Sequence, residues 1–326
     1  MKAMLARRYG NPNVFQWEEV PNPILKPNQI RIKTQYSAVN SADWRLRKPD
    51  PFAVRLFFGF FRPKRPILGG SFSGVVLEIG TKTKLDGIKI GDQIFGVTGM
   101  NFGAYAEQTV LSKNASFIKI PNNLNFEEAA SLPFGGLTAW HFLEKAKIQP
   151  GQSILIYGAS SSVGTAAVQL AKHYYKAKVT AVCSETNLEL VKSLGAEIAL
   201  DYKKTDLTKE QKKYDIIFET VGKTNFKSML EILSPGGVFL LGSAGVSDTI
   251  KGVFIHLTKR YKIHSGIAEE SVRGLEFLSA RVDDGSLRPV IDRNYPLEKL
   301  AEAHEYVEAG HKKGNVTVKI QTKDNI

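Results

Sequence analysis

The stretch that decides the fold is Ser153–Ser184, SILIYGASSSVGTAAVQLAKHYYKAKVTAVCS. It opens with a short apolar run, Ile154–Tyr157, which has the length of a buried parallel strand. Small residues fill the next stretch, from Gly158 to Gly164, and apolar residues then recur at helical spacing. A second β-branched run, Val179–Val182, closes the segment. Strand, small-residue turn, helix and strand together predict the βαβ unit that binds a dinucleotide.

The turn in this unit departs from the usual glycine pattern. A pyrophosphate sits on backbone N–H groups at a helix N-terminus, where a large side chain would hold it away. The common pattern is G-x-G-x-x-G, whereas this chain has Ala159-x-Ser161-x-x-Gly164. Serine hydroxyls can donate to phosphate oxygens, so the substitution is chemically tolerable. We interpret the turn as a dinucleotide site, with an ordinary strand-to-helix turn as the alternative.

The choice of cofactor is read at the end of the second strand. A site for NAD has Asp or Glu there, which accepts from the ribose 2′-OH. This chain has Cys183 followed by Ser184, so the carboxylate that would repel a 2′-phosphate is missing and a hydroxyl donor is present. Glu185 stands one residue further and can blunt the preference. We therefore expect NADPH as the cofactor.

Length and composition indicate a globular protein of one large domain or two ordinary ones. The chain has 326 residues, 43% of them hydrophobic and 23% charged. No apolar run approaches the roughly 20 residues that span a bilayer, and the N-terminal segment has no signal-peptide core. The single cysteine, Cys183, excludes an intramolecular disulfide and a cysteine-based zinc site. We expect a cytoplasmic protein with no membrane partner.

The formal net charge of +12 raises the question of a nucleic-acid partner. Lysine and arginine are spread along the chain, however, and no basic motif interleaved with aromatic residues is present. We expect a solvated basic surface, with local use for an anionic cofactor, and consider a nucleic-acid partner unlikely.

The pattern before the central stretch predicts a β-rich module. Strand-like runs occur near residues 29–34, 72–79, 90–97 and 103–110, separated by turn signals. They indicate a partly open barrel. Between them, residues 52–61 form an aromatic run whose glycine and bounding prolines favour a loop. Buried core and a lid over an apolar substrate are both open interpretations of this run.

The pattern around and after the central stretch predicts helices and further parallel strands. Residues 122–146 indicate a helix with an Asn cap and a break at 134–136. Strands are expected at 197–200, 214–218 and 237–242, with a tight turn at 234–237. The fold class is therefore α/β, with a doubly wound, mostly parallel sheet. After about residue 260 the alternation ends, and a helix at 297–307 precedes a last strand at 314–320.

Taken together, several segments resemble one family along nearly the whole chain. They are Val39–Trp44, Leu68–Val75, Gly103–Glu107, Leu132–Trp140 and Tyr157–Gly164. In this order they are similar to the zinc-independent quinone oxidoreductase branch of the medium-chain dehydrogenase/reductase superfamily. The resemblance implies a GroES-like domain over 1–121 and 266–326, a Rossmann domain over 122–265, a cleft between them and a homodimer.

The same superfamily contains zinc alcohol dehydrogenases, which provide a test. Where those enzymes carry the first catalytic cysteine, this chain has Asn40, and where they carry Gly-His-Glu it has Gly69–Gly70–Ser71. The structural four-cysteine lobe is absent from the sequence. Catalytic zinc needs three protein ligands, so we expect no metal.

The resemblance also assigns the site residues. Asn40 would donate to an acceptor oxygen, or would be a structural amide; Asp43 would be a structural acid, and Trp44 would wall the pocket. A tyrosine that assists catalysis in some relatives is replaced here by Arg45. The resemblance also implies cofactor contacts, some of which can equally be ordinary turn residues. Thr138 and Gly242–Ser243 would lie at the nicotinamide, and Ser160, Ser161, Ser162 and Val163 at the pyrophosphate. Ser184, Asn187 and Tyr202 would lie at the 2′-phosphate, and Asn315 would be a further cofactor contact.

These observations predict an NADPH-dependent, metal-free reductase of quinones or α,β-unsaturated carbonyls. Without a metal, hydride delivery is easiest to a conjugated acceptor, which spreads the developing charge. Two alternatives remain: an NADP-dependent alcohol or enoyl reductase on the same fold, and a catalytically weak cofactor-binding protein with a nucleic-acid or protein-interaction role.

Overall fold

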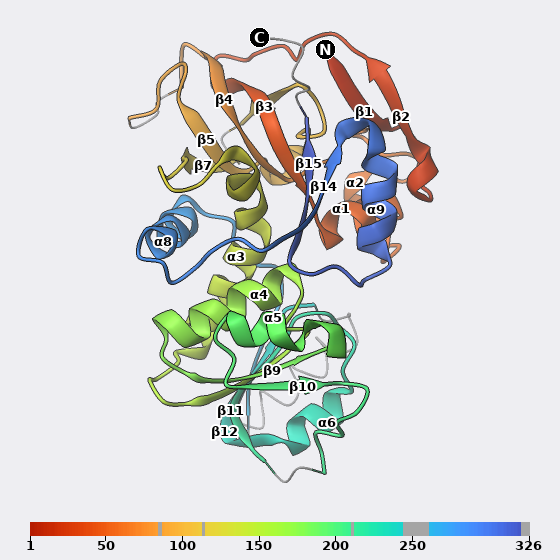
Figure 1. Ribbon diagram of the computed structural model, residues 1–326. Helices are drawn as coiled ribbons and strands as arrows, with labels where there is room; N and C mark the ends of the chain where they lie inside the picture. Colours follow the sequence, from red (N-terminus) through yellow and green to blue (C-terminus); the bar gives the residue numbers. More distant parts are fainter. Residues whose placement is uncertain (84–86, 113–114, 210–211, 244–260, 321–326) are drawn as a thin grey trace. The chain divides into compact units, whose positions relative to one another are not determined.

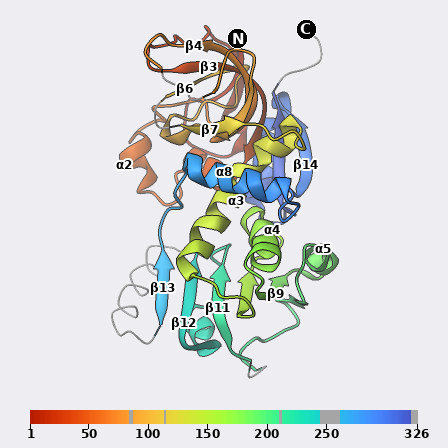
Figure 2. The same cartoon turned by 90° about the vertical axis from the view of Figure 1, so that its left-hand side faces the viewer.

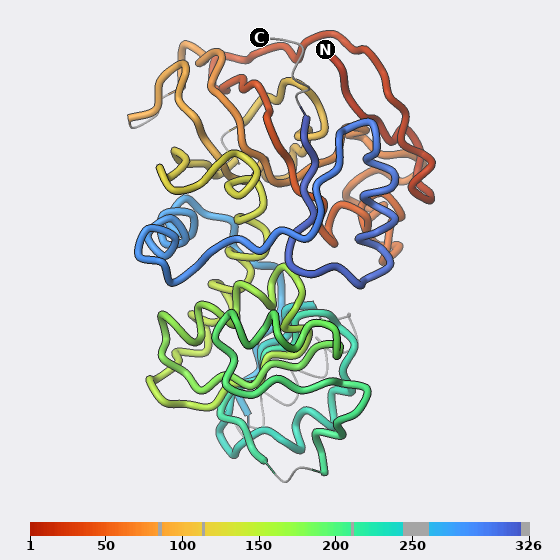
Figure 3. The backbone as a smooth tube through the Cα atoms, viewed as in Figure 1, coloured from red at the N-terminus to blue at the C-terminus, as the bar shows by residue number. Residues whose placement is uncertain are grey.

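The computed structural model describes residues 1–83, 87–112, 115–209, 212–243 and 261–320. These residues form two compact units. The first unit contains residues 1–134, 270–279 and 291–326, and the second contains 135–269 and 280–290. Figure 3 traces how the blue C-terminal segment returns to the unit that the red N-terminal segment begins. The domain boundaries at 121/122 and 265/266 stay predictions.

The second unit is built on a six-stranded parallel sheet (Figure 1). The strand order is β10-β9-β8-β11-β12-β13, which is the order of a doubly wound fold whose first strand is β8. The predicted α/β class is confirmed. The strands are β8 (Ser153–Tyr157), β9 (Lys178–Cys183), β10 (Ile198–Asp201), β11 (Tyr214–Glu219), β12 (Leu233–Leu241) and β13 (Lys262–Ser265). The helices of this unit are α4 (Ser162–Gln169), α5 (Leu188–Ser193) and α6 (Phe226–Glu231).

The core of this unit explains why its strands carry continuous apolar runs. Ile154, Leu155 and Ile156 of β8 are fully buried, as expected for a central strand covered on both faces. On one side, Phe226 and Met229 of α6 join a cluster that includes Leu155. The buried run therefore fixes β8 at the centre of the sheet.

The first unit is β-rich, as predicted. A seven-stranded sheet has the order β14-β15-β3-β4-β5-β7, with β6 also paired to β3, and a separate hairpin joins β1 and β2. The strands are β1 (Lys2–Ala6), β2 (Phe15–Glu19), β3 (Ile30–Val39), β4 (Ser71–Ile79), β5 (Gln93–Val97), β6 (Gln108–Leu111), β7 (Ser116–Lys119), β14 (Ile291–Pro296) and β15 (Asn315–Lys319). Its helices are α1 (Ser41–Arg47), α2 (Val54–Phe58) and α9 (Leu300–Glu308).

Two further helices contain unit boundaries: α3 (Phe126–Ala146) and α8 (Val272–Asp283). The predicted break in the first of these is wrong, because α3 continues through Gly135 and Gly136. The helix begins later than expected, after Asn125, whose Oδ1 accepts from the Glu128 N–H at 2.9 Å. Gly135 is required by packing, since a Cβ there would lie 2.4 Å from the Ser162 carbonyl oxygen.

Other element predictions also need correction. Residues 52–61 include the short helix α2 rather than only a loop, and of their aromatic side chains Phe58 alone is buried. The expected strand at 103–110 begins only at Gln108. The tight turn at 234–237 lies within β12, where the register against β11 shifts. A sixth parallel strand, β13, follows where the alternation was expected to end.

Candidate functional site

The turn between β8 and α4 is closed so tightly that two positions require glycine. Gly158 has φ +77°, and a Cβ there would lie 2.6 Å from a Val221 methyl and 2.7 Å from Thr220 Oγ1. A Cβ on Gly164 would lie 2.2 Å from the Gly158 carbonyl oxygen. The turn is therefore packed closely against the start of α4 and the residues after β11, which is the form that phosphate-binding turns take.

Ser161 caps α4. Its Oγ accepts from the Gly164 N–H at 2.9 Å and lies 3.1 Å from Thr220 Oγ1. The hydroxyl is thus committed to the cap, a role that the sequence interpretation did not assign to it. Val163 follows in the first turn of α4, where helix geometry supplies no acceptor for an N–H. An anion at this turn would meet backbone donors and the positive end of the helix dipole.

Thr220 is a residue of this turn that the sequence interpretation missed. It follows β11, and its Oγ1 donates to the carbonyls of Tyr157 at 2.9 Å and Gly158 at 3.1 Å. Beside it, the Glu219 carboxylate accepts from the N–H groups of Val221 at 3.0 Å and Gly222 at 2.7 Å. The signal was available, because polar residues directly after a parallel strand lie at the carboxyl edge of the sheet.

Asn187 lies against the same turn. It is 4% exposed, and its Nδ2 donates to Ser160 Oγ at 3.0 Å. Its Oδ1 is buried and has no hydrogen-bond partner among the residues that the structure describes. A buried amide oxygen of this kind calls for a donor such as water or a sugar hydroxyl. The structure thus brings together Ser160 and Asn187, which the resemblance assigns to the pyrophosphate and to the 2′-phosphate.

Within the described chain, every exposed carboxylate at the end of β9 is paired with a cation. Burial raises the pKa of the Cys183 thiol to about 11, which keeps it neutral. Glu185 forms an ion pair with Lys204 Nζ, and both side chains are more than half exposed. Tyr202 lies close by, since its N–H donates to the Cys183 carbonyl at 3.2 Å. Ser184 Oγ is half-buried and lies 3.3 Å from Thr186 Oγ1.

The remaining predicted residues of the second unit lie at the ends of β12 and within α3. The Gly242 N–H donates to the Glu219 carbonyl at 2.8 Å, and a Cβ on Gly242 would lie 2.8 Å from the Phe218 ring. Ser243 follows and is half-buried. Thr138 is half-buried in the part of α3 that belongs to this unit.

Asn40, Trp44 and Asn315 belong to the first unit. Asn40 is 2% exposed and directly precedes α1. Val316 lies opposite Val39 in the antiparallel pair of β15 and β3, so Asn315 and Asn40 share one end of that pair. The Asn40 Nδ2 is 3.5 Å from Ser71 Oγ, a long hydrogen bond. Trp44 is half-buried, with the Arg45 guanidinium 5.3 Å from its ring centroid.

Asp43 holds the start of α1 in place. Its Oδ2 accepts from the Asn40 N–H at 2.8 Å. Burial raises the pKa of Asp43 to about 7, opposed by hydrogen bonds from the Asn40, Gly69 and Gly70 backbone and the Tyr105 hydroxyl. These contacts tie α1 to the residues before β4, and they are the contacts of a structural acid.

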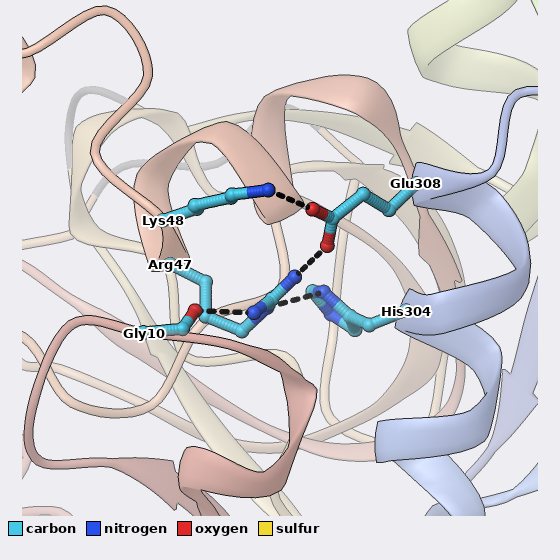
Figure 4. Close-up of polar contacts among 5 residues, drawn as sticks. All are labelled: Gly10, Arg47, Lys48, His304 and Glu308. Atoms are coloured by element: carbon cyan, nitrogen blue, oxygen red, sulfur yellow. Dashed lines mark hydrogen bonds and ion pairs between the residues drawn. The ribbon is translucent and has the colours of Figure 1, made fainter.

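A buried cation fastens α1 to α9 (Figure 4). The Arg47 side chain is fully buried and donates to Glu308 at 2.5 Å, to the Gly10 carbonyl and to His304 Nδ1 at 3.4 Å. Lys48 Nζ adds a contact to Glu308 at 2.6 Å. Burial, with the neighbouring charge of Arg47, lowers the pKa of His304 well below its ordinary value. His304 is therefore a neutral acceptor inside the fold.

The described residues contain neither a candidate metal site nor a candidate membrane-spanning helix. No group of three or more His, Cys, Asp and Glu side chains among the described residues could hold a metal ion. No helix in the described ranges is long and apolar enough to cross a membrane.

Comparison with known proteins matches both parts of the chain. Residues 26–122 match the alcohol dehydrogenase GroES-like domain, and residues 194–318 match the zinc-binding dehydrogenase family. The chain is 32% identical to 2-methylene-furan-3-one reductase of Solanum lycopersicum, covering 98% of this chain and 79% of that protein. It is 30% identical, with the same coverage, to the chloroplastic NADPH-dependent alkenal/one oxidoreductase of Arabidopsis thaliana. The solved quinone oxidoreductase of Coxiella burnetii is similar over 98% of this chain and 99% of that one, with a TM-score of 0.88 and 28% identity.

Proposed function

Because this chain belongs to the quinone-oxidoreductase-like branch of the medium-chain dehydrogenase/reductase superfamily, we propose that it is an NADPH-dependent reductase of quinones or α,β-unsaturated carbonyls. The names of the relatives support an oxidoreductase acting on such conjugated acceptors. When bound, a nicotinamide cofactor supplies the hydride for a reduction of this kind.

The single observation that carries the proposal is the turn between β8 and α4. A Cβ on Gly158 would meet Val221 and Thr220, and one on Gly164 would meet the Gly158 carbonyl, so the turn is packed closely against the start of α4, whose dipole favours an anion. The buried Oδ1 of Asn187, beside Ser160, is suited to a sugar hydroxyl. These residues fit a dinucleotide, with the pyrophosphate on the backbone of Ser160–Val163 and the adenosine ribose near Asn187.

NADPH is favoured over NADH by the residues after β9. Ser184 offers a hydroxyl, and Lys204 neutralises Glu185, the nearest carboxylate in sequence. Tyr202 offers a ring next to the end of the strand. A 2′-phosphate would therefore meet a hydroxyl donor, and the charge of Glu185 is balanced there by Lys204.

We assign Asn40 and Trp44 to the acceptor. The backbone of Asn40 is held by the start of α1, because its N–H donates to Asp43, and the long contact of its side-chain amide to Ser71 leaves that donor weakly engaged. A hydrogen bond from this amide would stabilise the negative charge that develops on a quinone or enone oxygen. Trp44 would supply an apolar wall. Thr138, Gly242–Ser243 and Asn315 stay assigned to the cofactor.

The residues do not fit zinc, although one matching family is named for it. By the resemblance, the positions that correspond to zinc ligands hold an amide, a glycine and a hydroxyl: Asn40, Gly70 and Ser71. Catalytic zinc takes thiolate, imidazole or carboxylate ligands, so no step of the reaction is assigned to a metal.

The test is NADPH oxidation with 9,10-phenanthrenequinone or an enone as acceptor, in the presence of a chelator, repeated with NADH. We expect turnover that does not respond to the chelator and is faster with NADPH. Loss of turnover in chelator would refute the metal-free reaction, and equal use of NADH would refute the cofactor preference. Bound NADPH without turnover of either acceptor class would favour a cofactor-binding protein. The homodimer and the cytoplasmic location stay predictions, which light scattering and fractionation of cells test.

A further inference from the structure

The segment from Phe52 to Phe61 presents large apolar side chains to solvent. The exposed fractions are 64% for Phe52, 65% for Leu56, 79% for Phe57, 52% for Phe60 and 86% for Phe61. We call these five residues the aromatic patch. Contiguous exposed apolar side chains of this size mark an interaction site more often than chance exposure does.

The aromatic patch is anchored by the core beneath it. Phe58 of α2 is 4% exposed, and its ring meets Phe102 edge-on at 5.4 Å between centroids. At Gly59, with φ +128°, the chain turns, and the Tyr9 hydroxyl donates to the Gly59 carbonyl at 2.6 Å. The Lys64 N–H then donates to the Phe58 carbonyl at 2.9 Å. The segment is thus ordered, with its apolar side chains turned outward.

The rings of the patch contact one another. Phe52 and Phe60 meet edge-on at 6.2 Å, and Phe60 and Phe61 at 5.1 Å. Arg55 joins them, because its guanidinium lies 5.5 Å from the Phe52 ring centroid and donates to the Phe60 carbonyl at 2.9 Å. Figure 2 shows α2 at the outer margin of the first unit. Phe52, Phe60 and Phe61 therefore form one continuous surface with Arg55, and Leu56 and Phe57 are exposed on α2, which lies between them in sequence.

Positive charge follows this surface directly along the chain. Arg62, Lys64 and Arg65 follow the patch directly, are exposed, and form no salt bridge with any residue that the structure describes. From Phe52 to Pro66 the sequence contains four basic residues and no acidic one. The surface combines aromatic side chains with uncompensated cations, so a suitable partner is apolar and anionic.

We propose that the aromatic patch, with Arg62, Lys64 and Arg65, docks this protein on an anionic membrane surface. The rings enter the boundary between headgroups and acyl chains, while the basic side chains contact anionic headgroups. A second copy is a poorer partner, because a two-fold contact places the same cations opposite each other. The chain lies on the bilayer and does not span it. This inference is independent of the reductase reaction.

The test is flotation of the full chain with vesicles of phosphatidylcholine mixed with phosphatidylglycerol, and with vesicles of phosphatidylcholine alone. We expect binding to the anionic vesicles that weakens when salt is raised from about 0.1 M to about 1 M, where the Debye length falls from about 10 Å to about 3 Å. Phe57→Ser with Phe61→Ser, and separately Lys64→Glu with Arg65→Glu, should each reduce vesicle affinity about tenfold or more.

Matched controls come from the same unit. Ile24 is 88% exposed but lies outside the patch, so Ile24→Ser should leave vesicle binding unchanged. Lys26→Glu with Lys82→Glu makes the same change in net charge as the basic double variant and should have little effect. Absence of binding to anionic vesicles, or equal loss in the controls, would overturn the proposal. So would self-association that the patch variants abolish while vesicle binding is unaffected, because that result assigns the patch to a second copy.

Discussion

The Asn187 amide donates to Ser160 Oγ across 3.0 Å, and this contact joins the residue before α5 to the turn before α4. Two parts of a dinucleotide, the pyrophosphate and the adenosine ribose, would otherwise be bound by separate loops. The hydrogen bond sets the spacing of the two loops before any ligand arrives, which lowers the ordering cost of binding.

Asn187→Ala should weaken NADPH binding without preventing folding. The substitution removes the donor to Ser160 and the unpartnered Oδ1, and lost hydrogen bonds of this kind cost about 1 to 2 kcal/mol, or roughly 5- to 30-fold in affinity. Fluorescence titration with NADPH measures the change, and turnover at saturating cofactor should be nearly constant. Unchanged affinity would remove Asn187 from the cofactor site.

Lys204→Gln should reduce the preference for NADPH. The substitution leaves the Glu185 carboxylate without its cation, and that charge then repels a 2′-phosphate. The pair is exposed and screened, so we expect a loss of about three- to tenfold in NADPH affinity. NADH affinity should be unaffected, and Lys192→Gln, on the exposed pair with Glu189, is the control. A parallel loss for both cofactors would contradict the assignment.

The strands of the second unit could be predicted because each is marked by residues that are adjacent in sequence. A buried parallel strand needs a continuous apolar run, and Ile154–Tyr157 and Val179–Val182 have it. The sixth strand, β13, carries alternating polar residues and is only partly buried, so periodicity does not distinguish it from a loop. Residues 244–260, before it, lie outside the described part of the chain.

The errors arose where tertiary contacts overrode local propensity. Gly135 and Gly136 are poor helix formers, yet α3 continues through them, and glycine is needed at 135 because Ser162 leaves no room there for a side chain. The Ser161 hydroxyl, which is expected at the pyrophosphate, in addition caps α4 and contacts Thr220. Thr220 lies 59 positions away in sequence, so its contact with Ser161 follows from the order of the strands in the sheet and not from the residues next to the turn.

Gly164→Ala should destabilise the second unit more than Gly151→Ala, which is the same substitution at a glycine with space for a side chain. The new Cβ would lie 2.2 Å from the Gly158 carbonyl oxygen, so the turn or α4 must move, at a cost of about 2 kcal/mol or more. Gly151→Ala is the control: its φ is +84° and nothing lies within 4 Å, so only backbone strain of about 1 kcal/mol is expected. Urea unfolding of both variants gives the comparison, and similar losses would show that the turn accommodates a side chain.

Because His304 is buried with a lowered pKa, the protein should be less stable in mild acid than at neutral pH. Burial and Arg47 lower the pKa of His304 in the folded protein, whereas an unfolded histidine titrates near about 6.5. Below that pH the unfolded state binds a proton that the folded state does not. The free energy of unfolding should therefore keep its full value above about pH 6.5. Below that pH it should fall, by up to about 1.4 kcal/mol per pH unit, until the pH reaches the pKa of His304 in the folded protein.

Comparison of the wild type with His304→Gln isolates this effect. The glutamine can still offer an acceptor to Arg47 but does not titrate, so it loses stability at neutral pH and less further stability in acid. Urea unfolding at a series of pH values should show the difference between the two proteins shrinking as the pH falls below about 6.5. His311→Gln, at an exposed histidine, should run parallel to the wild type. A wild-type curve that stays parallel to His304→Gln throughout would mean that His304 accepts a proton inside the fold, with Arg47 or Glu308 rearranged to allow it.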